Sequence, residues 1–195
     1  TLQTTQDLPS VPWLMVCFAF SPIQGEYAVA AMSCFRNGQP SKSGYRRFRI
    51  RTVSQQDDFA MMKEAVGRYF ARVASGELDN PTLVVIDGGK GQLASALEAV
   101  RESGVEMPPM IGLAKREEEI FLPGEAGPYV LSRRSEALRM LQRLRDEAHR
   151  FAVGYHRTIR TKENLISRLE KIPGIGKMRS RALISEFGSP EAVRR

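Results

Sequence analysis

The sequence predicts an α/β body, built from a mixed sheet with flanking helices, and a small helical segment behind it. Through residues 1–132, apolar runs of strand length alternate with helical patterns of apolar residues. From Ser132 onward the apolar spacing is helical only. The charge divides the chain at the same place: residues 133–195 carry 16 basic and 7 acidic side chains, and residues 1–132 carry 13 and 15. A basic last third indicates a polyanionic partner, and nucleic acid is favoured over an anionic membrane surface.

Three strands are expected first. Trp13–Phe20 is apolar and rich in aromatic and branched residues, which is typical of a buried strand. Tyr27–Phe35 is a second apolar run, and the Asn37-Gly38 pair that follows it is a strong signal for a hairpin turn. Tyr45–Ile50 alternates apolar with basic residues, so we expect a third strand whose arginines face solvent or a ligand.

Two helices are expected around a central strand. Apolar residues recur at helical spacing over Phe59–Val73, after Asp57 and Asp58, which are suited to cap that helix. Leu83–Ile86 is a branched apolar run without polar alternation, which predicts a strand buried on both faces. A second helix is expected over Leu93–Val100. The first and fourth strands can then lie side by side in one sheet.

Further strands and then helices complete the expected order. They are a strand over Met110–Ala114, a hairpin at Ile120–Leu122, a long amphipathic helix from Ser132, and short helices over Leu165–Ile172 and Met178–Phe187. We therefore predict a first domain over residues 1–157, a basic linker over residues 158–162 and a second domain over residues 163–195. Phe187–Glu191 has the pattern of a further element, so we expect the second domain to be cut short.

Asp87 is the first candidate for chemistry. It ends the central strand and is followed by Gly88 and Gly89, which allow a sharp turn. The carboxyl end of a central strand is where open α/β sheets place their chemistry. The alternative is that Asp87 serves as a turn residue or as the N-cap of the next helix.

His149 and a charged turn are further candidates. His149 lies one helical turn beyond Arg145. If that helix packs on the sheet, its imidazole could ligate a divalent metal or move a proton beside Asp87; the alternative is a structural histidine. Lys115 and Arg116 follow an apolar run and could hold a scissile strand, or they belong to a solvated charged turn.

A glycine-containing turn near the end of the sequence is a candidate for DNA binding. Gly174 and Gly176 precede Lys177 and Arg179 at the start of a predicted helix. Backbone N–H groups at such a helix start attract phosphate and hold DNA without reading its sequence. The alternative is an ordinary helical hairpin with a glycine turn.

The cysteine content and the hydropathy exclude other classes. Cys17 and Cys34 are the only cysteines and both lie in apolar runs, so we expect buried free thiols in a reducing compartment, the cytoplasm. No stretch is apolar enough to span a bilayer, and no N-terminal signal pattern is expected.

Several segments together resemble the C-terminal half of the UvrC family, the incision subunit of bacterial nucleotide excision repair. They are Ile86–Leu93, Gly112–Phe121, Arg145–Phe151 and Ile172–Gly176, with Tyr45–Phe48 and Ile23–Glu26 as further parts. The resemblance covers nearly the whole chain, in order. It implies an endonuclease domain of RNase H-like fold, then tandem helix-hairpin-helix motifs of which the second is truncated. It also implies damaged double-stranded DNA and UvrB as partners, with UvrA upstream, and no counterpart of the family's N-terminal nuclease domain.

The resemblance further implies a nuclease centre of two strand-borne aspartates and a histidine around Mg²⁺ or Mn²⁺, which cuts on the 5′ side of a lesion. Asp87 matches the second aspartate and His149 the histidine, but Ala19 stands where the first aspartate belongs. Pro22 also departs from the pattern. Asp58, where the family often carries an acid, is a further candidate ligand. Because alanine cannot bind a metal, we expect a chain that folds and binds DNA but cuts slowly or not at all.

The expected DNA contacts are the cationic residues near this centre and the glycine-containing turn: Arg46, Arg47, Lys90, Lys115, Arg116, Gly174, Gly176, Lys177 and Arg179. Two other functions remain open. One is a DNA-binding or scaffold module of a repair complex that does not cut, which Ala19 favours. The other is a ribonuclease or resolvase of the same fold.

Overall fold

The computed structural model describes residues 12–21, 29–50, 57–115 and 117–187. Pro22 and Arg116, which were singled out in the sequence, lie outside these ranges. The chain forms two compact units, residues 1–152 and residues 153–195. None of the helices in the described ranges is long and apolar enough to cross a membrane.

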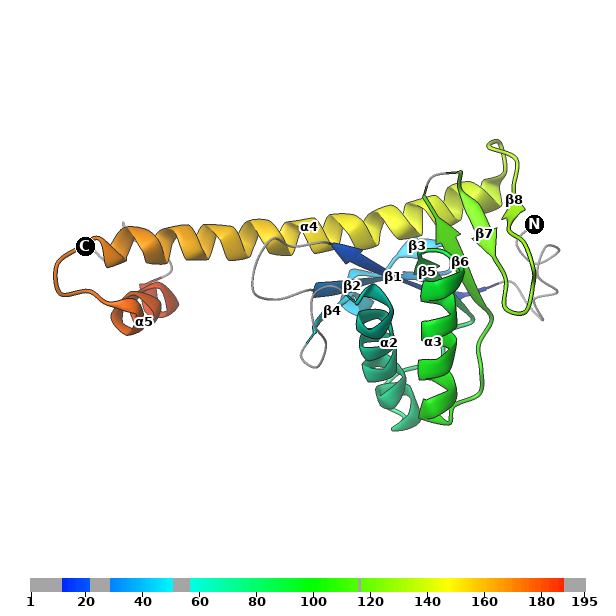
Figure 1. The fold of residues 1–195 in the computed structure, drawn as a ribbon, viewed down its shortest axis with the longest axis horizontal. Coiled ribbons are helices and arrows are strands. Elements are labelled where there is room, and N and C mark those ends of the chain that lie inside the picture. The colour runs from blue at the N-terminus through cyan, green and yellow to red at the C-terminus, as the bar shows by residue number, and fades with distance from the viewer. Residues whose placement is uncertain (1–11, 22–28, 51–56, 116, 188–195) are drawn as a thin grey trace. The chain divides into compact units, whose positions relative to one another are not determined.

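The described part of the first unit contains one mixed sheet of eight strands (Figure 1). The strands are β1 (Leu14–Ser21), β2 (Val29–Arg36), β3 (Gln39–Pro40), β4 (Arg46–Arg49), β5 (Leu83–Asp87), β6 (Met110–Ala114), β7 (Glu119–Phe121) and β8 (Tyr129–Val130). Their order is β3-β2-β1-β5-β6-β7-β8, and β4 also pairs with β2. β1, β5 and β6 are parallel, and the other pairs are antiparallel. The expected pairing of the first strand with the central strand is confirmed.

Helices cover both faces of this sheet. The helices of the first unit are η1 (Lys42–Gly44), α2 (Asp58–Ala74), α3 (Lys90–Ser103) and the start of α4 (Glu136–Glu170), and α5 (Lys177–Phe187) belongs to the second unit. α2 and α3 pack on one face of the sheet (Figure 1). Phe18, Val84 and Ile86 lie in the core between these helices and the sheet. The first turns of α4 pack on the other face, where Leu141 and Leu144 contact the core side chains of β1 and β5. The α/β prediction is therefore confirmed, with a helical layer on each side of the sheet.

Local signals fix two of the boundaries. Asn37 and Gly38 have φ angles of 49° and 75°, the left-handed backbone that the tight hairpin turn between β2 and β3 requires. The Asp57 carboxylate accepts a hydrogen bond from the Ala60 N–H at 2.9 Å and caps α2. Of the two aspartates expected to cap this helix, Asp57 is the one that does so.

The expected linker over residues 158–162 is helical instead. α4 continues without interruption over Glu136–Glu170, and the two compact units divide after Ala152. Basic residues were interpreted as a hinge, but residues 155–170 contain neither glycine nor proline and so nothing that ends a helix. The helix ends only near Pro173, because the residue before a proline is disfavoured in the helical region.

Candidate metal centre

Asp87 is the last residue of β5, and its side chain lies on the face of the sheet that α4 covers. Alternation along the strand places it on the same side as Leu83 and Val85, which belong to the core beneath α4. Its side chain is 8% exposed. Gly89, not Asp87, is the N-cap of α3. The alternative in which Asp87 serves as the N-cap of that helix is therefore excluded.

Glycines allow the backbone to turn closely behind Asp87. The Gly88 N–H donates a hydrogen bond to the Leu113 carbonyl oxygen at 3.1 Å. A Cβ on Gly112 would lie 2.9 Å from the Gly88 carbonyl oxygen, which is closer than carbon and oxygen pack. The absence of a side chain at this position of β6 thus lets the turn close on the neighbouring strand.

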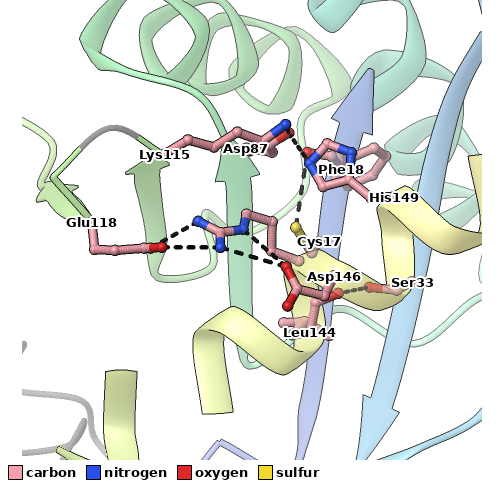
Figure 2. Close-up of polar contacts among 10 residues, drawn as sticks. Cys17, Phe18, Ser33, Asp87, Lys115, Glu118, Leu144, Asp146 and His149 are labelled. Atoms are coloured by element: carbon pink, nitrogen blue, oxygen red, sulfur yellow. Dashed lines mark hydrogen bonds and ion pairs between the residues drawn. The ribbon is translucent and has the colours of Figure 1, made fainter. Parts of the chain in front are cut away.

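His149 reaches this strand end from α4, as Figure 2 shows. Its Nε2 atom lies 2.9 Å from Asp87 Oδ2, and the imidazole is 23% exposed. Among the described residues, Nε2 is a buried nitrogen for which no hydrogen bond is formed, although the carboxylate lies this close. Two metal-binding atoms, 62 positions apart in the sequence, therefore meet at one point.

The spacing of these two atoms suits a hard divalent ion. Adjacent ligands of an octahedral Mg²⁺, at its usual bond length, are about 2.9 Å apart. A buried nitrogen without a hydrogen-bond partner is also what a metal ligand presents before the metal binds. Within the described ranges, however, no group of three His, Cys, Asp or Glu side chains could hold a metal. Asp87 and His149 therefore supply two ligand atoms at a spacing that fits a hard divalent ion.

Ala19 lies beside Asp87 at the ends of two neighbouring parallel strands. Phe18 of β1 is level with Ile86 of β5, so Ala19 and Asp87 are the next residues along. Ala19 belongs to the core beneath α4 and is completely buried, so it shares a face with Asp87. A carboxylate at position 19 would therefore lie next to Asp87, within the same site.

Asp58 is not part of this site. It is exposed in the first turn of α2. It forms no metal-binding group with Asp87 and His149. The sequence prediction of Asp58 as a further ligand thus gains no support from the geometry.

Lys115 is a second group that approaches Asp87. Its Nζ lies 3.8 Å from Asp87 Oδ2, and its side chain is 60% exposed (Figure 2). Lys115, which was predicted to contact DNA, thus lies beside the carboxylate of the candidate site. Its ammonium partly neutralises Asp87, and solvent weakens the attraction.

Three polar contacts attach this stretch of α4 to the sheet. The buried Ser33 hydroxyl donates to the Leu144 carbonyl oxygen at 2.6 Å. The Tyr45 hydroxyl donates to Glu147 Oε2 at 3.0 Å. Arg145 donates to both oxygens of Glu118, at 2.8 and 3.1 Å. The α4 residues of all three contacts lie near His149 along the helix. The contacts therefore hold the helix in place where its imidazole meets the sheet.

Two buried thiols lie in the same body and form no disulfide. Burial, and then the charge of Asp87, raise the pKa of the Cys17 thiol. Burial also raises the pKa of the Cys34 thiol. The prediction of two buried free thiols is confirmed.

The structure separates the two arginines of β4 that were predicted to bind DNA together. The Arg47 guanidinium stacks on the Phe151 ring at 3.8 Å, on the face covered by α4. The Arg46 guanidinium lies on the other face and donates to the carbonyl oxygens of Ser43 and Tyr45, at 2.7 and 2.9 Å. Successive strand residues point to opposite faces, so only Arg47 shares a face with the metal centre.

The remaining predicted contacts lie at helix starts. Lys90 is the exposed first residue of α3. In the second unit, Gly174 has a φ of 85°, and its carbonyl oxygen accepts a hydrogen bond from Arg179 at 2.7 Å. Lys177 is the exposed first residue of α5, directly after Gly176. Arg179, which was predicted to bind DNA together with this glycine turn, thus stabilises the turn through a hydrogen bond.

The contacts that sequence reasoning missed are those between distant segments. Arg145 and Glu118 lie in segments that were singled out, but 27 positions separate them and no local pattern pairs them. The Tyr45 to Glu147 and Ser33 to Leu144 hydrogen bonds are likewise beyond a single sequence. Only the lone glycine inside the Met110–Ala114 run was a readable signal, for the close approach at Gly112.

The chain is similar in sequence to known proteins over nearly its whole length. Residues 3–153 match the family model described as the UvrC RNAse H endonuclease domain. The chain is 49% identical over 193 residues to UvrABC system protein C of Gemmatimonas aurantiaca, covering 99% of this chain and 31% of that protein. It is 48% identical over 198 residues to UvrABC system protein C of Dehalococcoides mccartyi, covering 99% and 33%.

A solved structure is also similar to this fold. The crystal structure of human ENDOV matches with a TM-score of 0.40 and 10% identity, over 80% of this chain and 91% of that one. The chain spans about a third of the length of the curated relatives it matches. On the family model and on these relatives, the chain belongs to the UvrC family, and residues 3–153 are its RNase H endonuclease domain.

Proposed function

We propose that this chain is the DNA-incision part of a UvrC-family protein, a metal-dependent endonuclease that makes the 5′ cut in nucleotide excision repair. The observation that carries the proposal is the meeting of Asp87 Oδ2 and His149 Nε2 at 2.9 Å, without a hydrogen bond between them. UvrABC system protein C is the name of its relatives, so the proposed partners are UvrB, with UvrA upstream, and damaged duplex DNA. The proposed setting is the cytoplasm.

Asp87 and His149 are the residues that would hold the ion, Mg²⁺ or Mn²⁺. When bound, such an ion lowers the pKa of a water molecule and neutralises charge on the scissile phosphate. Lys115, 3.8 Å from Asp87 Oδ2, would place a cation against a phosphate oxygen. The contacts of α4 to Ser33 and Tyr45 attach the helix to the sheet beside the imidazole, which favours a site that is formed before DNA binds.

We also propose that the site is impaired in this sequence because Ala19 occupies the position of a second carboxylate. One carboxylate and one imidazole neutralise only half of a divalent charge. Ala19 is fully buried beside Asp87, and no other described acidic residue completes the group. The expected consequence is weak metal binding and slow cutting.

The second unit is proposed to bind the DNA backbone as a helix-hairpin-helix over residues 163–195. Leu169, Ser180 and Ile184 are buried within the hairpin, whereas Lys177 and Arg179 are exposed at the start of α5. The open glycine turn and the helix start together offer N–H groups to phosphate.

The alternative function is a DNA-binding or scaffold module of a repair complex that does not cut. The specific observation in its favour is Ala19, since a site without its second carboxylate can retain DNA binding while losing catalysis. The two functions share the second unit and differ only at the metal centre.

Nicking of a damaged duplex, with UvrA and UvrB supplied and Mg²⁺ or Mn²⁺ present, separates them. We expect Ala19→Asp to cut at least about 100-fold faster than the present sequence, since even groups behind metal ligands contribute 10- to 100-fold. Ala19→Asn is the matched control, with similar volume and no charge, and should stay slow. If Ala19→Asp is no faster than Ala19→Asn, the metal centre is misplaced and the scaffold function is favoured.

A further inference from the structure

An imidazole and an ammonium group both approach the same oxygen of Asp87, and they come from different elements. His149 comes from α4, and Lys115 comes from the turn after β6. An ion pair between Arg145 and Glu118 joins that helix to that turn. Arg145 precedes His149 by one helical turn, and Glu118 follows Lys115 by three residues.

The Arg145–Glu118 pair is bidentate and largely shielded from solvent. Arg145 Nη1 and Nη2 donate separately to the two Glu118 oxygens, at 2.8 and 3.1 Å. The Arg145 side chain is 9% exposed and that of Glu118 is 27% exposed, so water weakens the attraction little. A second carboxylate, Asp146, lies 3.4 Å from Arg145 Nε but is 58% exposed.

The backbone of Glu118 is a second observation. Its φ is 55°, and in the described part of the chain only Asn37 is another non-glycine residue with positive φ. Asn37 stands in an Asn-Gly turn, where asparagine tolerates this conformation, whereas glutamate has no such preference. An unfavourable backbone conformation persists only where contacts with the rest of the protein hold it. For Glu118, these contacts are the two hydrogen bonds from the Arg145 guanidinium.

We propose that the Arg145–Glu118 pair is a positioning device for the metal centre, which sets the Lys115 turn and the His149 helix against Asp87. The inference rests on the proposed function for its use in catalysis, but the placement of His149 can be measured without it. A pair that only stabilises the fold would lower stability when broken and leave His149 in place. A positioning pair also changes the surroundings of the imidazole.

Variants can separate the charge from the strain. Glu118→Gly removes the carboxylate and suits the positive φ, so the turn keeps its backbone. Arg145→Lys keeps the charge but cannot make the two-pronged contact. Arg139→Gln is the matched control, because it breaks an exposed pair with Glu136 on the same helix, away from the site.

The deciding readout is the NMR signal of the His149 imidazole in the metal-free protein, identified with His156→Gln because the chain has only two histidines. Mn²⁺ affinity, measured by electron paramagnetic resonance of the free ion, is the second readout. We expect Glu118→Gly and Arg145→Lys to shift or broaden the His149 signal and to weaken Mn²⁺ binding about tenfold, the usual effect of losing a group behind a metal ligand. Arg139→Gln should change neither.

The swapped pair Arg145→Glu with Glu118→Arg should recover part of the signal. If Glu118→Gly and Arg145→Lys remain folded with an unchanged His149 signal, the positioning role is overturned, whatever the metal does. If the Ala19→Asp variant binds no Mn²⁺ at all, the proposed metal chemistry fails, but a shifted His149 signal in Glu118→Gly and Arg145→Lys still supports the positioning role.

Discussion

Three groups could neutralise the negative charge of Asp87: His149, Lys115 and a metal ion. Lys115 is the one whose removal leaves the others in place, because its side chain is exposed and its Nζ is 3.8 Å away. A cation at that distance opposes a second cation at the same carboxylate. The same ammonium is also suited to a phosphate, so its effect differs between the free and the DNA-bound protein.

Lys115→Met should therefore tighten Mn²⁺ binding in the absence of DNA, by about threefold, a small effect because solvent screens the exposed ammonium. In the Ala19→Asp background, the same change should slow nicking because the phosphate loses its cation. Lys90→Met, at the exposed start of α3, is the control for the Mn²⁺ measurement and should leave that affinity unchanged. Calorimetric titration with Mn²⁺ measures the first effect, and an unchanged or weaker affinity in Lys115→Met would contradict the charge argument.

The buried thiols give a prediction of pH dependence. Because burial raises the pKa of Cys17 and of Cys34, the reactive thiolate is scarcer in the folded protein than in a free cysteine at every pH below the raised pKa. We expect both thiols to resist iodoacetamide at pH 8 in the native protein and to react after unfolding. Mass spectrometry of the alkylated chain counts the labels, and rapid native labelling of Cys17 would show that the core beneath α4 opens.

At the scale of elements, the predictable features were those written in consecutive residues. The central strand and its terminal Asp87, the Asn37-Gly38 turn and the cap at Asp57 all follow from local patterns, and the structure agrees with each. The linker over residues 158–162 was predicted from its basic composition and is helical. Composition alone does not end a helix, since arginine and lysine favour one.

The two aspartates at the start of α2 give an element-scale prediction with its own control. Asp57→Ala should lower the free energy of unfolding by about 1 kcal/mol, because the Ala60 N–H loses its acceptor. Asp58→Ala should cost less, since Asp58 lies in the first turn, where an acidic side chain is stabilised by the helix dipole, and the cap is Asp57. Urea unfolding measures both. Mn²⁺ affinity should be unchanged in Asp58→Ala, and a clear loss of affinity would restore Asp58 as a ligand.

At the scale of the whole molecule, the fold class was predictable but the convergence of the site was not. Residues distant in sequence, such as Asp87 and His149, meet only because α4 packs on one face of the sheet, and periodicity does not say where along that face. The resemblance to the UvrC family supplied that pairing. The resemblance did not predict the ion pair between Arg145 and Glu118, because neither residue belongs to the implied metal centre.

Metal binding is proposed for the first unit and duplex binding largely for the second. Substitutions should therefore change one of these two activities without the other. Gly176→Val is the sharper probe of the hairpin, because a Cβ on Gly176 meets no atom of the protein, whereas Gly174 has a positive φ that valine would strain. We expect Gly176→Val to weaken duplex binding and reduce its salt dependence without changing Mn²⁺ affinity.

Gly127→Val, at a similarly open glycine of the first unit, is the control for that change. Asp87→Asn should do the opposite, abolishing Mn²⁺ binding while duplex affinity persists. Fluorescence anisotropy across a salt series measures duplex binding. If Gly176→Val binds duplex as tightly as the parent chain at every salt concentration, the hairpin serves packing only.

The central claim is that Asp87 and His149 are two ligands of a metal site that Ala19 leaves incomplete. The most direct test is the anomalous scattering of manganese in Mn²⁺-soaked crystals of the Ala19→Asp variant. We expect one strong peak within bonding distance of Asp87 Oδ2 and His149 Nε2, and a weak or absent peak in crystals of the present sequence. A strong peak bound by other side chains, with none between these two atoms in the variant, would contradict it.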